Sequence, residues 1–197
     1  MVLVGLMGSG KSTVGRKLAR LVGLGFVDAD VELEARSGRS VATWFEDHGE
    51  AGFRAAEARL LVELLGGPDP VVLGTGGGVV VTDVNRDRLA EDDVTVVYLH
   101  AEPAFLASRV TAKAHRPLLT GDPAAVLGAM YHERDGWYRE VADVVVEVRP
   151  AHEVGGKPRW RLAEQVAAAL AAGVVDPTAV ADAATVRSAV DGGRSDR

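Results

Sequence analysis

Residues 5–13 read GLMGSGKST, and this stretch decides the fold because it matches the phosphate-binding pattern G-x-x-x-x-G-K-[ST]. An apolar run at residues 2–4 precedes it, and residues 11–22 follow with apolar side chains at helical spacing. A strand, a glycine turn and a helix in this order predict a nucleotide-binding loop. In the alternative, a glycine turn that only joins a strand to a helix, the lysine would have no reason to follow Gly10.

The chemistry of this loop suits a nucleoside triphosphate with Mg²⁺. Glycines allow successive backbone N–H groups to converge on phosphate oxygens, and the helix N-terminus adds its positive dipole. Lys11 is expected to bridge the β- and γ-phosphates, and the Ser12 hydroxyl to bind Mg²⁺. The predicted nucleotide-binding residues of the loop are Gly8, Ser9, Gly10, Lys11, Ser12 and Thr13.

The loop alone does not separate GTPases, ATPase motors and small-molecule kinases, because all three classes share it. A GTPase needs an Asn-Lys-x-Asp segment that reads guanine. The nearest match, VNRD at residues 84–87, has the wrong second residue and no predicted strand ahead of it. Residues further along the chain must therefore decide the function.

Composition excludes several classes of protein. The 197 residues suit one globular domain, and the formal net charge of −6 argues against a nucleic-acid partner. Cysteine is absent, which excludes disulfides and thiolate metal sites and fits the cytoplasm. No stretch approaches the roughly 18 apolar residues of a membrane span, so no membrane partner is expected. The histidines lack the spacing of metal ligands.

Strands and helices alternate along the predicted chain, which indicates an α/β fold with a parallel sheet and helices on both faces. In such sheets, ligands bind at the carboxyl ends of the strands. The loop at Gly5, the pair Asp28 and Asp30, and residues 76–78 all follow predicted strands, so we expect them to share one crevice. Beyond the first two elements, the expected strands are residues 26–28, 71–73, 94–99 and 143–148, and the expected helices are residues 31–36, 41–48, 51–65, 103–110, 123–139 and 161–172.

Asp28 and Asp30 are two residues apart at a strand end, where extended backbone would point both carboxylates to the same side. One carboxylate can then serve Mg²⁺ while the other meets the substrate. The alternative is that Asp30 only caps the helix expected from Val31.

Two further features each allow two interpretations. Arg54 and Glu57 are three residues apart on a predicted helix, where they form either a solvated ion pair or part of a site for an acidic substrate. Three successive glycines, Gly76, Gly77 and Gly78, are costly in regular structure, which favours a close approach of backbone to a ligand over a flexible turn.

Six separated motifs together resemble the shikimate kinase family, small-molecule kinases with a phosphate loop and a mobile lid. The resemblance spans residues 5 to about 148 and fades after Pro150, where residues 152–160 (HEVGGKPRW) look inserted. The motifs are GLMGSGKSTVGRKLA from residue 5, FVDADVELEARSGRSVATWF from residue 26, GEAGFRAAE from residue 49, GTGGGVV from residue 74, HRPLLTG from residue 115, and Tyr138-Arg139.

The resemblance implies a three-layer kinase fold that transfers phosphate from ATP, with Mg²⁺, to the 3-hydroxyl of shikimate in aromatic amino-acid biosynthesis. It also implies a domain at residues 1–172, with a substrate-binding helical region at about 31–65 and a lid at about 111–123. Residues 173–197 are expected to form a poorly ordered tail, and a monomer is expected. Strand-first loops of this kind usually follow a few more residues, which leaves open whether the chain starts further upstream.

The resemblance assigns roles residue by residue. Asp28 assists the Mg²⁺ shell through water, because the acidic residue that usually follows the strand at residues 71–73 is missing. Asp30 binds a substrate hydroxyl and is the candidate base. Arg116, in the basic lid segment, covers the γ-phosphate, although an ordinary basic loop is the alternative there. The implied catalytic residues are Lys11, Asp30 and Arg116; the implied shikimate-binding residues are Asp30, Arg54 (oriented by Glu57), Gly76, Gly77, Gly78 and Arg139; Arg109 and Arg149 flank adenine.

Two rival functions remain open on the sequence. Another small-molecule kinase, such as gluconate kinase, shares the loop, the lid and the topology, and Arg54, Arg139 and the glycine triplet favour shikimate over it. A non-catalytic ligand-binding module is the rival from another class, and the presence of Lys11, Ser12, Asp30 and Arg116 argues against it.

Overall fold

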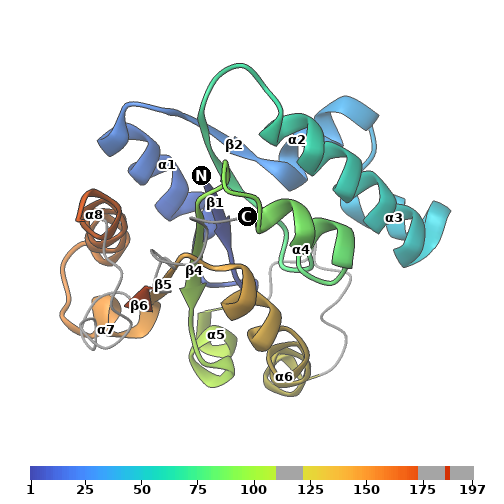
Figure 1. Cartoon of the computed structure of the whole chain (residues 1–197). Coiled ribbons are helices and arrows are strands. Elements are labelled where there is room, and N and C mark those ends of the chain that lie inside the picture. The colour runs from blue at the N-terminus through green and yellow to red at the C-terminus, as the bar shows by residue number, and fades with distance from the viewer. Residues whose placement is uncertain (110–121, 173–184, 187–197) are drawn as a thin grey trace, which may run out of the picture.

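The computed structural model describes residues 1–109, 122–172 and 185–186, and it confirms the α/β fold (Figure 1). Five parallel strands form a sheet in the order β2-β3-β1-β4-β5, and a two-residue strand, β6, pairs antiparallel with β5. The strands are β1 (Val2–Val4), β2 (Gly25–Asp28), β3 (Val71–Gly74), β4 (Val96–His100), β5 (Val144–Glu147) and β6 (Thr185–Val186).

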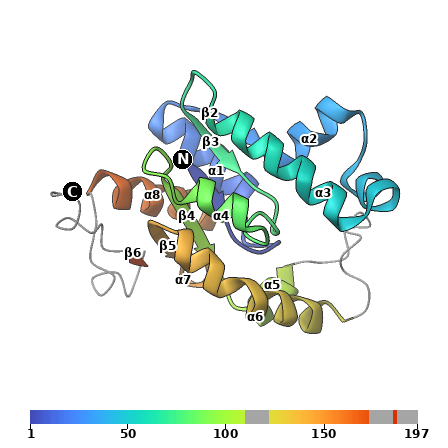
Figure 2. The ribbon, with the colours of Figure 1, turned by 45° about the vertical axis from the view of Figure 1, so that its right-hand side comes forward.

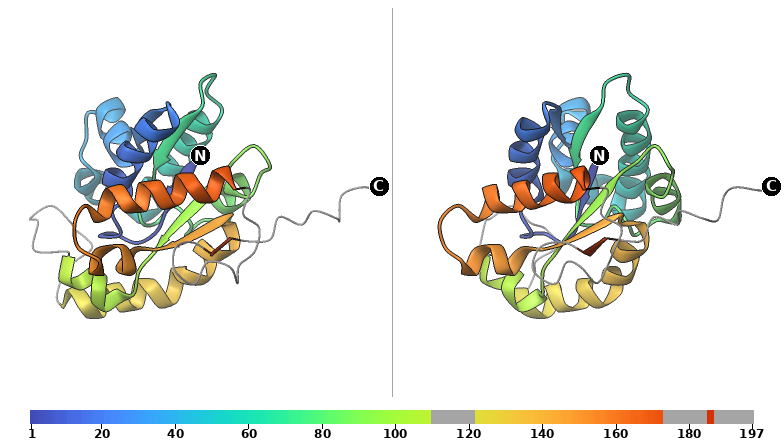
Figure 3. Two further views of the ribbon diagram at one scale, coloured as in Figure 1. Left: turned by 90° about the vertical axis from the view of Figure 1, so that its left-hand side faces the viewer. Right: turned by 60° about the vertical axis from the view of Figure 1, so that its left-hand side comes forward.

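Helices cover both faces of the sheet. Helices α1 (Lys11–Val22) and α8 (Pro158–Ala171) pack together and cover one face, which Figure 3 shows from the front. Helices α4 (Asp83–Leu89) and α6 (Pro123–Val141) lie on the other face (Figure 2). The remaining helices are α2 (Ala29–Ser37) and α3 (Val41–Leu65), which pack on each other, α5 (Pro103–Arg109), which packs on α6, and α7 (Val148–Glu153), which packs on α8.

The sequence explains why the central strands form here. Residues 2–4 are Val-Leu-Val and all three side chains are completely buried, as a parallel strand covered on both faces requires. Helix α1 presents Val14 and Leu18 to this strand, and glycines in left-handed conformation flank the helix at Gly10 and Gly23. None of the described helices combines the length and the apolarity that a membrane span requires.

The expected division into helices at residues 41–48 and 51–65 is confirmed, because the non-helical backbone of Gly49 (φ 65°, ψ −178°) breaks α3 between them. Other elements differ from the sequence expectation. Helices α4 and α7 were not expected, because seven and six residues carry too few apolar positions to show a period. Strand β6 lies within the segment expected to be a poorly ordered tail, most of which is outside the described residues.

The strand register brings three loops to one edge of the sheet. Gly74, at the end of β3, is the register partner of both Leu3 in β1 and Asp28 in β2. The phosphate loop after β1, the acidic residues after β2 and the glycines after β3 therefore leave the sheet together. This edge is the carboxyl end of the parallel strands, where ligands are expected.

Candidate active site

A cavity of about 560 Å³ opens at this edge of the sheet, and its volume suits a small-molecule site. Its walls come from the phosphate loop, from the start of α2, from α3, from the glycine turn after β3 and from α6. The polar residues and glycines that line it are Gly8, Gly10, Lys11, Ser12, Thr13, Asp28, Asp30, Glu34, Arg54, Glu57, Thr75, Gly76, Gly77, Gly78, Arg109, Arg134 and Arg159, with Leu6, Met7, Val41, Phe45, Phe53 and Met130 as apolar walls.

The phosphate loop has the backbone that its glycines predict. Gly5, Gly8 and Gly10 all have positive φ, between 88° and 136°, a region that side-chain-bearing residues rarely adopt. Gly10 caps α1 without a side-chain hydrogen bond, so the helix N-terminus is left open for an anion. The Lys11 Nζ donates hydrogen bonds to the carbonyl oxygens of Gly5 (2.6 Å) and Leu6 (3.1 Å), which folds the lysine over the loop.

Ser9 differs from its neighbours in the loop. Its side chain is buried and does not line the cavity. Thr13, by contrast, lines the cavity with Ser12. A contribution of Ser9 to phosphate binding is limited to its backbone.

Two arginines mark the end of the cavity beyond Gly8. Arg109 donates to the Gly8 carbonyl oxygen (Nε, 3.3 Å) and to Nδ1 of His152 (2.9 Å), and Arg159 lines the same cavity. Burial and the charges of Arg109, Arg159 and Arg161 lower the pKa of His152 to about 4, so this histidine is neutral at physiological pH and can accept from Arg109. Arg159 was missed because the segment around it departs from the family pattern.

Arg149 is not part of this site. Its guanidinium pairs with Glu153 (Nε to Oε1, 2.7 Å) and Glu102 (3.5 Å), it is 54% exposed, and it does not line the cavity. The expectation that Arg149 flanks the nucleotide base is corrected, because α7 begins at Val148 and turns this side chain toward its own helix.

Asp28 and Asp30 both line the cavity, but only Asp28 is on extended backbone. Asp28 ends β2 and is the N-cap of α2, with no side-chain capping bond, whereas Asp30 lies in the first turn of the helix. The capping alternative for Asp30 is therefore wrong. Burial raises the pKa of the Asp30 carboxyl above its ordinary value of 3.8, and the negative charge of Asp28 raises it further.

Arg54 and Glu57 form a buried ion pair, so the solvated alternative is wrong. The Arg54 Nη1 lies 2.8 Å from Glu57 Oε2, and both side chains are no more than 8% exposed. Glu50 also accepts from Arg54, at 3.3 Å. Burial raises the pKa of the Glu57 carboxyl, although Arg54 opposes this shift. Among the described residues, the other carboxylate oxygen of Glu57, Oε1, is buried with no hydrogen-bond partner.

The glycine triplet allows these charged groups to approach the backbone. A Cβ at Gly76 would lie 2.9 Å from Asp30 Oδ1 and 3.0 Å from Glu57 Oε1. A Cβ at Gly78 would overlap the Arg54 guanidinium. Glycine at positions 76 and 78 thus lets the ends of Asp30, Glu57 and Arg54 pack directly on this turn, and a side chain there would displace them.

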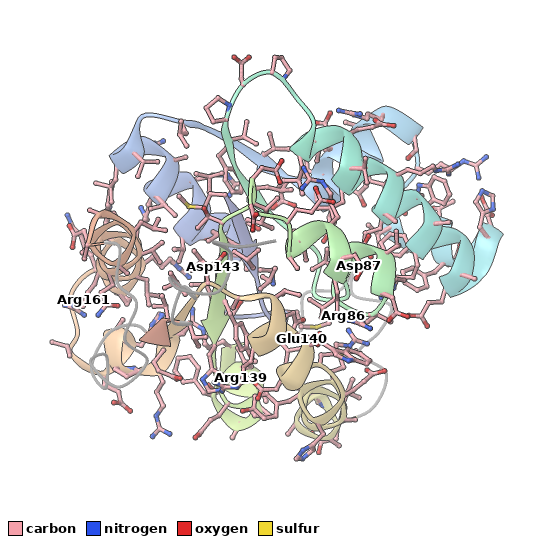
Figure 4. The ribbon with its side chains drawn as sticks, in the orientation of Figure 1. Arg86, Asp87, Arg139, Glu140, Asp143 and Arg161 are labelled. Atoms are coloured by element: carbon pink, nitrogen blue, oxygen red, sulfur yellow. The ribbon has the colours of Figure 1, made fainter. Side chains whose placement is uncertain are left out.

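Arg139 does not join Arg54, which corrects the expected pair of arginines. Its Nε lies 2.8 Å from Asp135 Oδ2 and its side chain is 43% exposed. Figure 4 shows Arg139 well separated in the view from α2 and α3. Arg134, five residues earlier on α6 and so on a different face of the helix, lines the cavity instead, with Nη1 3.2 Å from the Gly77 carbonyl oxygen.

A sequence signal for Arg134 existed. Leu127, Arg134, Tyr138 and Val141 are all buried on α6, at the spacing of a helical apolar stripe. An arginine on such a stripe faces the core or a cavity, and its buried charge has to be balanced by a partner or used in binding a ligand. Arg139 follows Tyr138 directly and therefore lies about 100° around the helix from it.

The residues around the loop fit Mg²⁺ only together with a phosphate ligand. Ser12 and Asp28 offer oxygen atoms to the same cavity, and oxygen is the ligand that Mg²⁺ prefers. Within the described ranges, no group of three or more His, Cys, Asp or Glu could hold a metal ion by itself. Arg116 and the expected lid at 111–123 lie outside the described residues, except for Asp122 and Pro123.

Replacing Asp30 with asparagine should stabilise the fold. Between pH 3.8 and the raised folded pKa, the native protein holds a proton that the unfolded chain has released, so native stability falls as pH rises through this window. Asparagine has no carboxyl group to deprotonate, so the variant avoids this loss of stability. We expect Asp30→Asn to raise the Tm by about 3 °C at about pH 7.5 and by less at about pH 5.

Thermal unfolding of the two proteins at both pH values measures this effect. The exposed Asp69 provides the matched control, because Asp69→Asn makes the same chemical change outside the cavity. A lower Tm for Asp30→Asn than for the wild type at about pH 7.5 would contradict a raised pKa of Asp30.

Known proteins share both the sequence and the fold of this chain. The shikimate kinase family model matches residues 7–172. A shikimate kinase of Halorhodospira halophila is 51% identical over 158 residues, which are 80% of this chain and 85% of the relative. One of Pseudomonas syringae pv. syringae is 45% identical over 167 residues, which are 83% of this chain and 96% of the relative.

Solved structures agree with these sequence relatives. A shikimate kinase from Acinetobacter baumannii in complex with shikimate superposes with a TM-score of 0.80 at 35% identity, covering 89% of this chain and 94% of that one. A shikimate kinase from Bacteroides thetaiotaomicron gives a TM-score of 0.77 at 28% identity, with 87% and 97% covered.

Proposed function

The chain belongs to the shikimate kinase family, whose enzymes act in the shikimate pathway to aromatic amino acids, and we propose that its cavity binds ATP at the phosphate loop and shikimate beside it. One observation carries this assignment of roles. Arg54, Arg134 and Asp30 line the same cavity as Lys11 and Ser12, so a site for a carboxylate and a site for phosphates lie within one cavity. This arrangement suits an acidic acceptor with hydroxyl groups.

Arg54 and Arg134 bind the carboxylate of shikimate in this proposal. Both guanidinium groups are mostly buried, which strengthens their hydrogen bonds to an anion. Glu57 and Glu50 hold Arg54 from one side, whereas Arg134 donates from Nη1 to the Gly77 carbonyl oxygen and from Nε to Glu133 Oε2 (3.0 Å). The remaining N–H donors of both arginines are then available to the substrate.

Asp30 orients the 3-hydroxyl of shikimate and accepts its proton. The oxygen of this hydroxyl forms a bond to the γ-phosphorus of ATP, the bond from that phosphorus to the β–γ bridging oxygen breaks, and ADP leaves with the electron pair. The raised pKa of Asp30 makes its carboxylate a better proton acceptor than an exposed aspartate. Glu57 Oε1, a buried acceptor, suits a second hydroxyl of the ring.

Lys11 and the open N-terminus of α1 hold the phosphates. Lys11 now bonds to the Gly5 and Leu6 carbonyl oxygens, and we propose that it turns from them to the β- and γ-phosphates. Ser12 and Asp28 would hold Mg²⁺, Asp28 through water; when bound, Mg²⁺ neutralises charge on the phosphate oxygens. Arg116 would add a second positive charge over the γ-phosphate.

The nucleotide base is placed between Arg109 and Arg159 in this proposal. His152 fixes Arg109 by accepting from Nη1, and Arg159 approaches from the N-terminal turn of α8. We further propose that residues 1–172 form the catalytic domain, since they supply both the phosphate loop and the walls of the acceptor site, and that it works as a cytoplasmic monomer.

An acceptor panel tests this function. The protein is incubated with ATP and Mg²⁺ and with shikimate, gluconate or quinate, and the products are followed by ³¹P NMR and by ADP release. We expect a phosphate ester at the 3-oxygen of shikimate and little product from the other two acids. Tight shikimate binding without ADP release would support the non-catalytic module, and turnover of gluconate alone would overturn the proposed acceptor.

A further inference from the structure

The carbonyl oxygens of the turn at residues 76–80 accept hydrogen bonds from the turn's own backbone and from the neighbouring helices. Val79 N donates to Gly76 O (3.4 Å) and Val81 N to Gly78 O (3.0 Å). The side chains of Asn85 and Arg86, on α4, donate to the carbonyl oxygens of Val79 (2.9 Å) and Val80 (2.6 Å). The carbonyl oxygen of Gly77 accepts hydrogen bonds from α6 instead.

Two side chains of α6 share the Gly77 carbonyl oxygen. The Tyr138 hydroxyl donates to it at 2.5 Å and Arg134 Nη1 at 3.2 Å. The structure contains no cis peptide bond among the residues it describes, so the N–H of Gly78 points to the opposite side of this peptide from its carbonyl oxygen. Within the same described residues, the N–H groups of Gly76, Gly77 and Gly78 donate to no partner.

The Tyr138 hydroxyl is not explained by packing. The ring is completely buried and stacks on Tyr98, with ring centroids 4.8 Å apart, which a phenylalanine could do equally well. Its hydroxyl contacts the one carbonyl oxygen that also anchors Arg134. Burial raises the pKa of this phenol, so it stays protonated and can act only as a donor to that carbonyl oxygen.

We propose that Tyr138 is a positioning residue for the acceptor site: its hydroxyl fixes the Gly77–Gly78 peptide, and so sets both the Gly78 N–H and the anchored end of Arg134. The inference rests on the proposed function, since it matters only if shikimate binds against this turn. Tyr138 itself does not line the cavity and does not touch the substrate.

The conservative variant Tyr138→Phe tests this role. We expect it to raise both the KM for shikimate and the shikimate Kd of the nucleotide-free protein by about tenfold, as expected for one buried hydrogen bond. The KM for ATP and kcat should stay within about twofold, because among the described residues the Tyr138 hydroxyl bonds to Gly77 and not to the phosphate loop. Isothermal titration and steady-state kinetics give these values.

Tyr98→Phe is the matched control. It removes a hydroxyl from the ring stacked on Tyr138, where that hydroxyl donates to Asp135 Oδ1 at 2.8 Å and does not reach the glycine turn. We expect Tyr98→Phe and Tyr138→Phe to lower the Tm by similar amounts, but we expect the shikimate KM of Tyr98→Phe to stay within about twofold of the wild type. An unchanged shikimate KM in Tyr138→Phe, or an equal rise in Tyr98→Phe, would overturn the positioning role.

The proposed function can fail separately from this inference. Arg134→Ala removes a residue of the cavity wall, so it reports on the acceptor site whatever Tyr138 does. If Arg134→Ala weakens shikimate binding and Tyr138→Phe does not, the acceptor site stands and the positioning role is wrong. If neither variant weakens binding, the acceptor site itself is misplaced.

Discussion

Lys11→Met should lower kcat by about 10³-fold even at saturating ATP and shikimate, because in the proposed mechanism the transferred phosphoryl group loses the positive charge of Lys11. Methionine has nearly the length of lysine but no charge and no N–H donors. The loss should therefore fall on the transition state more than on binding, and the KM values should change less than kcat. A coupled ADP-release assay measures both.

Lys17→Met is the matched control for this prediction. Lys17 is on the same helix, and its Nζ lies 4.4 Å from the ring centroid of Trp160, outside the cavity. We expect its kcat within about twofold of the wild type. If Lys17→Met lost as much activity as Lys11→Met, the loss would report damage to α1 and the role of Lys11 would be unsupported.

Arg134→Ala should raise the KM for shikimate by about 50-fold, because a mostly buried charge-assisted hydrogen bond to the carboxylate is lost. The KM for ATP should change by less than about threefold, since Arg134 reaches the cavity from α6 and the phosphates are held from α1. Steady-state kinetics with each substrate varied in turn separates the two effects.

Arg139→Ala, five residues further along α6, is the control. Its ion pair with Asp135 is half-exposed, and such pairs contribute little. We expect a shikimate KM within about twofold of the wild type. If Arg139→Ala weakened shikimate binding and Arg134→Ala did not, the expected pair of Arg54 and Arg139 would be restored and the position of Arg134 would be irrelevant to the acceptor.

The parts of the site that are contiguous in sequence could be predicted. The phosphate loop needs only its own glycines, Lys11 and Ser12, because local backbone geometry creates the anion site. The alternation of strands and helices predicts the parallel sheet, and the sheet brings Asp28 and the glycine triplet to the loop. That much follows from the pattern of residues and the physics of parallel sheets.

The site residues that the sequence misplaced lie on α6, where the rotation of the helix decides which side chain faces the cavity, and around residues 149–159, where the chain departs from the family pattern. The sequence places an arginine on α6, but only the buried stripe through Leu127, Tyr138 and Val141 shows that Arg134 faces inward and Arg139 does not. Arg149 was paired with adenine from family resemblance, and the start of α7 turns it away. Neither the burial of the Arg54–Glu57 pair nor the place of Arg159 can be read from spacing.

A crystal structure of the protein with shikimate and a non-hydrolysable ATP analogue tests the location of the acceptor most directly. We expect the shikimate carboxylate within hydrogen-bond distance of the guanidinium groups of Arg54 and Arg134, and the 3-hydroxyl oxygen between Asp30 and the terminal phosphorus. A carboxylate bound to Arg139, or a shikimate ring outside the cavity at Gly76–Gly78, would contradict the arrangement proposed for this enzyme.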